Sequence, residues 1–126
     1  MPIVTLTIRK SQSSSFKTTV LDSIRAALVS SGVPPPDKFQ RVIDLEADDF
    51  RFDASSPDLK IARNDDLVLI EIPWSVGRSV KVKKTLLEEL KSGLARAGLN
   101  AENVMVCFKE TSWENWSFGG VRLIRT

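Results

Sequence analysis

The chain has 126 residues, of which 42% are hydrophobic and 27% are charged, and its formal net charge is +2. These values are typical of one globular domain, and so small a charge gives no electrostatic reason to expect a nucleic acid or a membrane as a partner. No apolar run approaches the ~20 residues of a membrane-spanning helix. Residues 9–15 are polar, which argues against a secretory signal, and the single cysteine fits a reducing cytoplasm.

The residues that the chain lacks restrict its chemistry. It contains no histidine and no tyrosine, which excludes His-based catalytic triads and proton shuttles. A zinc site is not expected with one cysteine and no histidine, and we expect neither a metal nor an organic cofactor. Any catalysis must use carboxylates, Lys, Arg, Ser, Thr, the cysteine or the amino group of the chain itself.

Residues 2–8 form the first predicted strand, whose apolar positions are Ile3, Val4, Leu6 and Ile8. Met1 precedes a small residue, so we expect its removal, which leaves Pro2 with a free secondary amine. An α-amino group titrates near ~8, and desolvation or a neighbouring cation lowers its pKa. Pro2 is therefore a candidate general base or iminium-forming nucleophile near neutral pH. The alternative is that Pro2 has no special role.

A helix is predicted after this strand, because Ser13 or Ser14 can cap it and apolar residues follow at helical spacing. Gly32 ends the helix, and the three prolines at 34–36 prevent it from continuing. Residues 38–45 are a second predicted strand, and residues 46–66 are a predicted loop or short hairpin.

The same pattern begins again at Leu67. Residues 67–72 are a strongly apolar predicted strand, Ser79 can cap a second helix that Gly98 ends, and residues 104–108 are the last predicted strand. We expect Cys107, within that strand, to be a small core residue.

The two halves align without a gap at an offset of 66 residues, the separation of Gly32 from Gly98. Apolar positions coincide throughout, which predicts a duplicated β-α-β unit. The repeat units span about 1–46 and 67–110 of a single domain, and residues 111–126 form a C-terminal tail. The fold class is α+β: parallel strands within each unit, one four-stranded sheet, and both helices on one face. Because the strands look apolar on both sides, we expect an oligomer that covers the other face.

A duplicated β-α-β chain of this size that opens with Met-Pro resembles the tautomerase superfamily, and more narrowly its branch of malonate semialdehyde decarboxylase-like proteins. The residues that carry the resemblance span nearly the whole chain. They are Pro2, Gly32-Val33-Pro34 with Asp37, Ile61-Ala62-Arg63, Gly77-Arg78-Ser79 with Lys83 and Leu86, and Trp116-Ser117-Phe118-Gly119.

The resemblance implies roles for five residues. Pro2 would be the general base, and Arg78 would bind a substrate carboxylate, for which a guanidinium has the right bidentate geometry. Asp37 would orient water or assist decarboxylation, and Trp116 and Phe118 would form an aromatic wall of the pocket. The alternatives are a solvated Arg78, a turn role for Asp37, and packing of the two aromatic residues on the core or on a neighbouring subunit.

The expected function is that of a cofactor-independent tautomerase that acts on a small 2-oxo or enol carboxylic acid. We expect the protein to be a homo-oligomer, with a trimer as the expected form. One alternative is decarboxylation or hydration of a short 3-oxo or acetylenic acid, although Val76 stands where the decarboxylase-like pattern has a second arginine. Another is a non-catalytic oligomeric binding protein that retains Met1. The tail departs from the family pattern after Gly119, and Arg122 or Arg125 could reach a neighbouring subunit.

Overall fold

The computed structural model describes residues 2–9 and 12–123. The removal of Met1 and the placement of Arg125 therefore concern positions outside the described residues. The strands are β1 (Val4–Arg9), β2 (Gln40–Leu45), β3 (Val68–Ser75) and β4 (Val104–Thr111). The helices are α1 (Ser14–Ser30) and α2 (Val80–Arg96), with three short 3-10 turns at Ala47–Asp49, Ala101–Asn103 and Trp113–Asn115.

The two long helices begin and end in the same way. The Ser13 hydroxyl accepts the amide hydrogen of Phe16 at the start of α1, and Ser79 accepts that of Val82 at the start of α2. After each helix a glycine with positive φ, Gly32 or Gly98, allows two further amide hydrogens to reach the last carbonyls of the helix. Each of these contacts recurs 66 residues later, so the duplication is present in the local structure.

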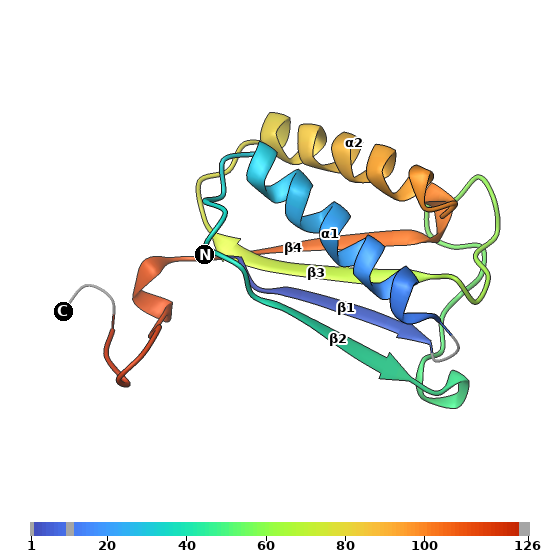
Figure 1. Cartoon of the computed structure of the whole chain (residues 1–126), viewed down its shortest axis with the longest axis horizontal. Helices are drawn as coiled ribbons and strands as arrows, with labels where there is room; N and C mark the ends of the chain where they lie inside the picture. Colours follow the sequence, from blue (N-terminus) through green and yellow to red (C-terminus); the bar gives the residue numbers. More distant parts are fainter. Residues whose placement is uncertain (1, 10–11, 124–126) are drawn as a thin grey trace.

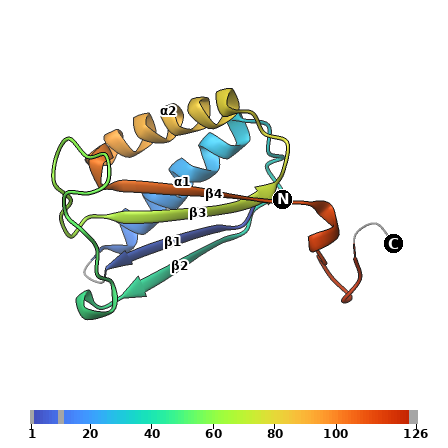
Figure 2. The same cartoon turned by 180° about the vertical axis from the view of Figure 1, so that it is seen from behind.

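The four strands form one mixed sheet in the order β2-β1-β3-β4. Strands β1 and β2 are parallel, and so are β3 and β4, whereas β1 and β3 pair antiparallel at the centre. Each parallel pair is one β-α-β unit, as the duplication predicts. Both helices cover the same face of the sheet (Figures 1 and 2).

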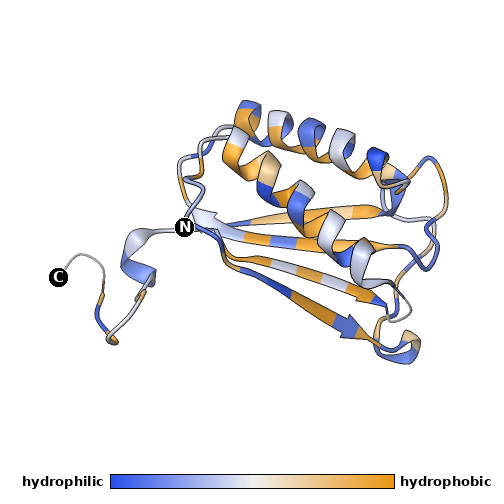
Figure 3. Ribbon diagram, in the orientation of Figure 1, coloured by the Kyte–Doolittle hydropathy of each residue, from blue (hydrophilic) through white to orange (hydrophobic). Residues whose placement is uncertain are grey.

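The core lies between the helices and the sheet, where apolar residues of both layers meet (Figure 3). Alternate residues of each strand point to this side, and along β3 they are Val68, Ile70, Ile72 and Trp74, all fully buried. Gly93 allows the helices to approach closely, because a Cβ there would lie 3.1 Å from the Cβ of Ser23.

The uncovered face of the sheet is mixed in character, which corrects the prediction that the strands are apolar on both sides. Thr5 accepts a hydrogen bond from Arg41 (2.8 Å), and Glu71 pairs with Lys109 (2.7 Å), beside apolar side chains such as the half-exposed Met105. Cys107 is exposed, so its placement in the core was wrong. Its neighbours Val106 and Phe108 take the core-facing positions of β4, which leaves Cys107 on the opposite face.

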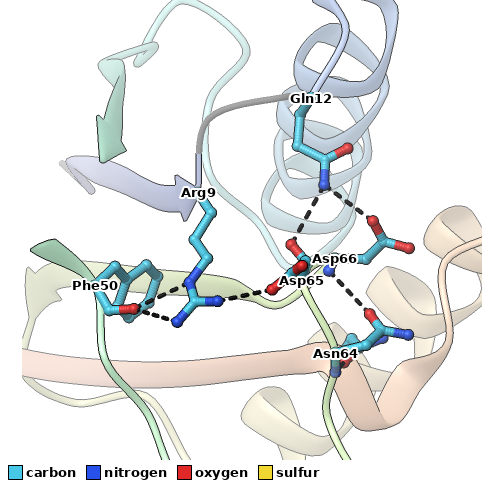
Figure 4. Close-up of polar contacts among 7 residues, drawn as sticks. Arg9, Gln12, Phe50, Asn64, Asp65 and Asp66 are labelled. Atoms are coloured by element: carbon cyan, nitrogen blue, oxygen red, sulfur yellow. Dashed lines mark hydrogen bonds and ion pairs between the residues drawn. The ribbon is translucent and has the colours of Figure 1, made fainter. Parts of the chain in front are cut away.

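The predicted loop between the two units is anchored at the end of the sheet where β1 stops (Figure 4). The Arg9 guanidinium donates to the Phe50 carbonyl and to Asp65, and the Gln12 amide donates to Asp66. Within the described residues, no helix is long and apolar enough to cross a membrane.

Candidate active site

Four candidate segments meet at the opposite end of the sheet from this loop: the start of β1, the segment before β2, the connection from β3 to α2, and the tail after β4 (Figures 1 and 2). Antiparallel pairing of β1 with β3 brings Pro2 and Ile3, which precede β1, to the end of β3. The Ile3 amide donates to the Pro73 carbonyl at 3.0 Å, two residues beyond the pair of Thr5 with Glu71, and the same register places Pro2 opposite Trp74.

Pro2 is buried and lines a narrow pocket together with Asp37. The Val4 amide donates to the Phe39 carbonyl at 2.9 Å, which draws the segment before β2 against the start of β1. Asp37 is half-buried, and its own amide donates to the Pro34 carbonyl in the turn that follows the helix. Two of the predicted site residues therefore share one pocket.

Arg78 lies in the connection between β3 and α2, immediately before the cap residue Ser79. Its guanidinium carbon lies 4.4 Å from the centre of the Trp74 ring. The Trp74 ring in turn stacks on Phe108, with ring centres 4.8 Å apart and planes inclined by 14°. Because Trp74 lies alongside Pro2, this stack brings Arg78 to the same end of the sheet as the predicted base.

Trp116 and Phe118 lie in the tail and are not among the residues that line the Pro2 pocket. Their rings are 5.2 Å apart, and the Trp116 indole donates to the Thr111 hydroxyl at 2.6 Å. Thr111 donates to the Trp74 carbonyl and accepts the Val76 amide at its own carbonyl, so the base of the tail is tied to the segment that carries Arg78. Their role as a pocket wall stays a prediction.

Sequence reasoning passed over two residues of this region. It did not select Trp74, whose ring contacts the Arg78 guanidinium. The signal available was the four-residue spacing of an aromatic residue and a cation across the end of a strand. It did not select Arg25 of α1, which lines the Pro2 pocket and donates to the Pro35 carbonyl at 2.9 Å. No pattern in the sequence marks Arg25.

The arrangement offers an amine position, a cation and a carboxylate, which suits proton transfer on a small anionic compound. Among the described residues no cluster of three or more His, Cys, Asp or Glu side chains could hold a metal ion. This chain therefore combines duplicated β-α-β units with a buried proline at position 2, at one end of the sheet.

Residues 37–119 match the sequence model of the family described as "Tautomerase enzyme". The match covers more than half of the chain, so the chain belongs to this family. No curated protein sequence matches the chain.

Solved structures with the same fold include two malonate semialdehyde decarboxylases. One, the FG41 enzyme inhibited by 3-bromopropiolate, is 22% identical with a TM-score of 0.85 over 96% of this chain and 92% of that chain. The other, solved as wild-type, mutant and inactivated forms, is 25% identical with a TM-score of 0.85 over 96% and 93%. The native fused 4-OT is 18% identical with a TM-score of 0.75 over 94% and 93%.

Proposed function

We propose that the protein is a cofactor-independent tautomerase that interconverts the enol and keto forms of a small 2-oxo carboxylic acid. The observation that carries the proposal is the position of Pro2, which is buried in one pocket with Asp37 at the end of the sheet where Arg78 contacts Trp74. Membership of the tautomerase family supports it.

In the proposed reaction the neutral Pro2 amine removes the proton from the enol hydroxyl. The protonated amine then delivers a proton to the alkene carbon next to the carbon that bears this oxygen, which gives the keto form. The amine ends as it began, so the step needs no cofactor. The Arg78 guanidinium binds the substrate carboxylate and stabilises the negative charge that develops on the enolate oxygen. Trp116 and Phe118 contribute apolar contacts, and the proline stays poorly solvated.

The experiment is ketonisation of the enol of phenylpyruvate by protein whose intact mass shows that Met1 is absent. Positioned proton transfer contributes about 10²–10⁴-fold to rates, so Pro2→Ala, whose primary amine has a different geometry, is expected to lose most of the activity. Equal activity of the wild type and the variant would exclude Pro2 as the base.

A second candidate is decarboxylation of a short 3-oxo acid or hydration of an acetylenic acid, with Asp37 acting beside Pro2. The shared pocket of these two residues favours it, and one similar structure is described as a basis for decarboxylase and hydratase activities. Val76 counts against it, since it replaces the second arginine of the decarboxylase-like pattern. Release of CO₂ from malonate semialdehyde, abolished by Asp37→Asn, would favour this candidate over the tautomerase.

We also propose that the protein is a cytoplasmic homo-oligomer, with a trimer as the expected form. The mixed, uncovered face of the sheet supports an assembly, and a similar structure with a TM-score of 0.73 is described as a symmetric trimer of fused 4-OT. A non-catalytic binding protein of the same fold would instead retain Met1 in its intact mass and show no ketonisation.

A further inference from the structure

Trp74 has an unusual environment for a core residue. It is the largest fully buried side chain of the protein, at the last core-facing position of β3. One neighbour of its ring is the Phe108 ring and the other is the Arg78 guanidinium, at centre distances of 4.8 and 4.4 Å. An aromatic ring and a cation thus both contact the indole.

The indole N–H of Trp74 is buried and has no hydrogen-bond partner among the described residues. A buried tryptophan usually finds an acceptor for this group, and leaving a buried donor unpaired is unfavourable. Phenylalanine or leucine would fill the core without that penalty. Packing alone therefore does not account for tryptophan at this position.

Arg78 is held in a way that leaves its charge available. In the described part of the chain, neither a carboxylate nor a carbonyl accepts a hydrogen bond from its guanidinium, and the Trp74 ring is its observed contact. A carboxylate partner would hold the guanidinium equally well but would neutralise its charge. Tryptophan is the strongest cation–π partner among the side chains, and it leaves the N–H donors of the arginine free for an anion.

We infer that Trp74 is a positioning residue of the site, whose indole holds the Arg78 guanidinium ready to bind the substrate carboxylate. The inference rests on the proposed function of Arg78. It adds that carboxylate affinity depends on a residue that itself touches no substrate, and that this dependence acts through Arg78.

The test compares Trp74→Phe, which keeps a weaker aromatic platform, with Trp74→Leu, which removes it. The matched control is Phe52→Leu, because Arg9 lies 4.5 Å above the Phe52 ring at the far end of the sheet. KM and kcat are measured for ketonisation of the enol of phenylpyruvate, alone and in an Arg78→Gln background, with circular dichroism to verify folding. The NMR resonance of the Arg78 side-chain N–H, identified by its loss in Arg78→Gln, reports the stack directly through the ring current of Trp74.

We expect KM to rise by about tenfold in Trp74→Leu and less in Trp74→Phe, as the strength of a partly buried cation–π contact implies, with kcat little changed. The same substitutions should change KM less than twofold in the Arg78→Gln background, and Phe52→Leu should have no effect. The Arg78 resonance should shift downfield in Trp74→Leu.

An unchanged KM in Trp74→Leu, or an equal rise of KM with and without Arg78, would overturn the inference and leave the proposed function standing. If the wild-type protein shows no ketonisation, the proposed function fails instead. The Arg78 resonance then decides the positioning role: a downfield shift in Trp74→Leu supports it, and an unmoved resonance overturns it.

Discussion

Arg78 carries its positive charge beside an aromatic ring instead of a carboxylate. A guanidinium binds a carboxylate through two parallel N–H donors, whereas a lysine ammonium offers one point charge. If Arg78 binds a substrate anion as proposed, we expect its identity as an arginine, and not only its charge, to matter.

We predict that Arg78→Gln lowers kcat/KM for ketonisation by about 100-fold and Arg78→Lys by about tenfold, since a hydrogen-bonded charge pair contributes about 1.5–3 kcal/mol. Steady-state kinetics measure both. Arg51→Gln, an exposed arginine at the far end of the sheet, is the control and should match the wild type. Equal losses in Arg51→Gln and Arg78→Gln would show that the effect is one of overall charge.

At the scale of elements, the two helix starts are a natural matched pair. Ser13 and Ser79 make the same capping hydrogen bond 66 residues apart, but only Ser79 adjoins a candidate site residue. Loss of either cap should cost about 1 kcal/mol of unfolding free energy.

We predict that Ser13→Ala and Ser79→Ala lower the melting temperature by similar amounts, while only Ser79→Ala raises KM, because fraying at the start of α2 displaces Arg78. Thermal unfolding by circular dichroism and steady-state kinetics measure the two effects. A KM change of the same size in both variants would contradict the assignment of Arg78.

The connection between the two units depends on Asp53, whose carboxylate accepts the amides of Ser55 and Ser56 and the Ser55 hydroxyl. The Ser55 and Ser56 amides are the main reason why the pKa of Asp53 lies below its usual value. A lowered pKa means that the carboxylate stabilises the fold above the unfolded-state pKa near 3.8, and that this stabilisation is lost as the pH falls through the folded-state pKa.

We predict that Asp53→Ala lowers the melting temperature at pH 7 and that the difference from the wild type shrinks below about pH 4. Melting curves between about pH 2.5 and pH 7, a range that includes the titration of an ordinary aspartate, measure this difference. The exposed Asp48→Ala is the control. A difference that is constant with pH would show that the charge of Asp53 plays no part.

The helices could be predicted from the sequence because their caps are local. Ser13, Gly32 and their counterparts contact residues within one turn, so the pattern alone places both helix ends. Strand β3 was predicted to stop at residue 72 but continues to Ser75. Proline usually interrupts a central strand, yet Pro73 lies where β1 begins, and its carbonyl accepts the Ile3 amide.

The part of the site that the sequence could not predict depends on contacts between distant segments. Pro2 was selected for its amine, and Arg78 for its place before a helix, but the pairing of β1 with β3 decides that the start of β1 meets the end of β3, where Trp74 contacts Arg78. Likewise, which side chains of β4 face the helices depends on its register with β3, and the placement of Cys107 was wrong for this reason.

At the scale of the whole molecule, one face of the sheet is left without a covering layer (Figure 2). The Glu71–Lys109 ion pair lies on this face together with apolar side chains. Met105, 43% exposed, is among the apolar residues of this face.

We predict a particle of about three times the 14.0 kDa chain mass in size-exclusion chromatography with light scattering. Met105→Glu should dissociate it, because a carboxylate would be buried without a partner. Val80→Glu, at a 68% exposed position on α2, should leave it intact. A wild-type particle of single-chain mass would contradict the assembly.

The central claim is that the free amine of Pro2 acts as the base, and the most direct test changes only that amine. We would measure kcat/KM for ketonisation of the enol of phenylpyruvate against pH, for protein that begins at Pro2 and for protein with one extra residue before it. In the second form the proline nitrogen is an amide without basicity. The claim predicts that kcat/KM of the first form rises with pH as a group with a pKa at or below ~8 loses its proton. It also predicts that the extended form has lost this activity. Equal rates for the two forms would contradict it.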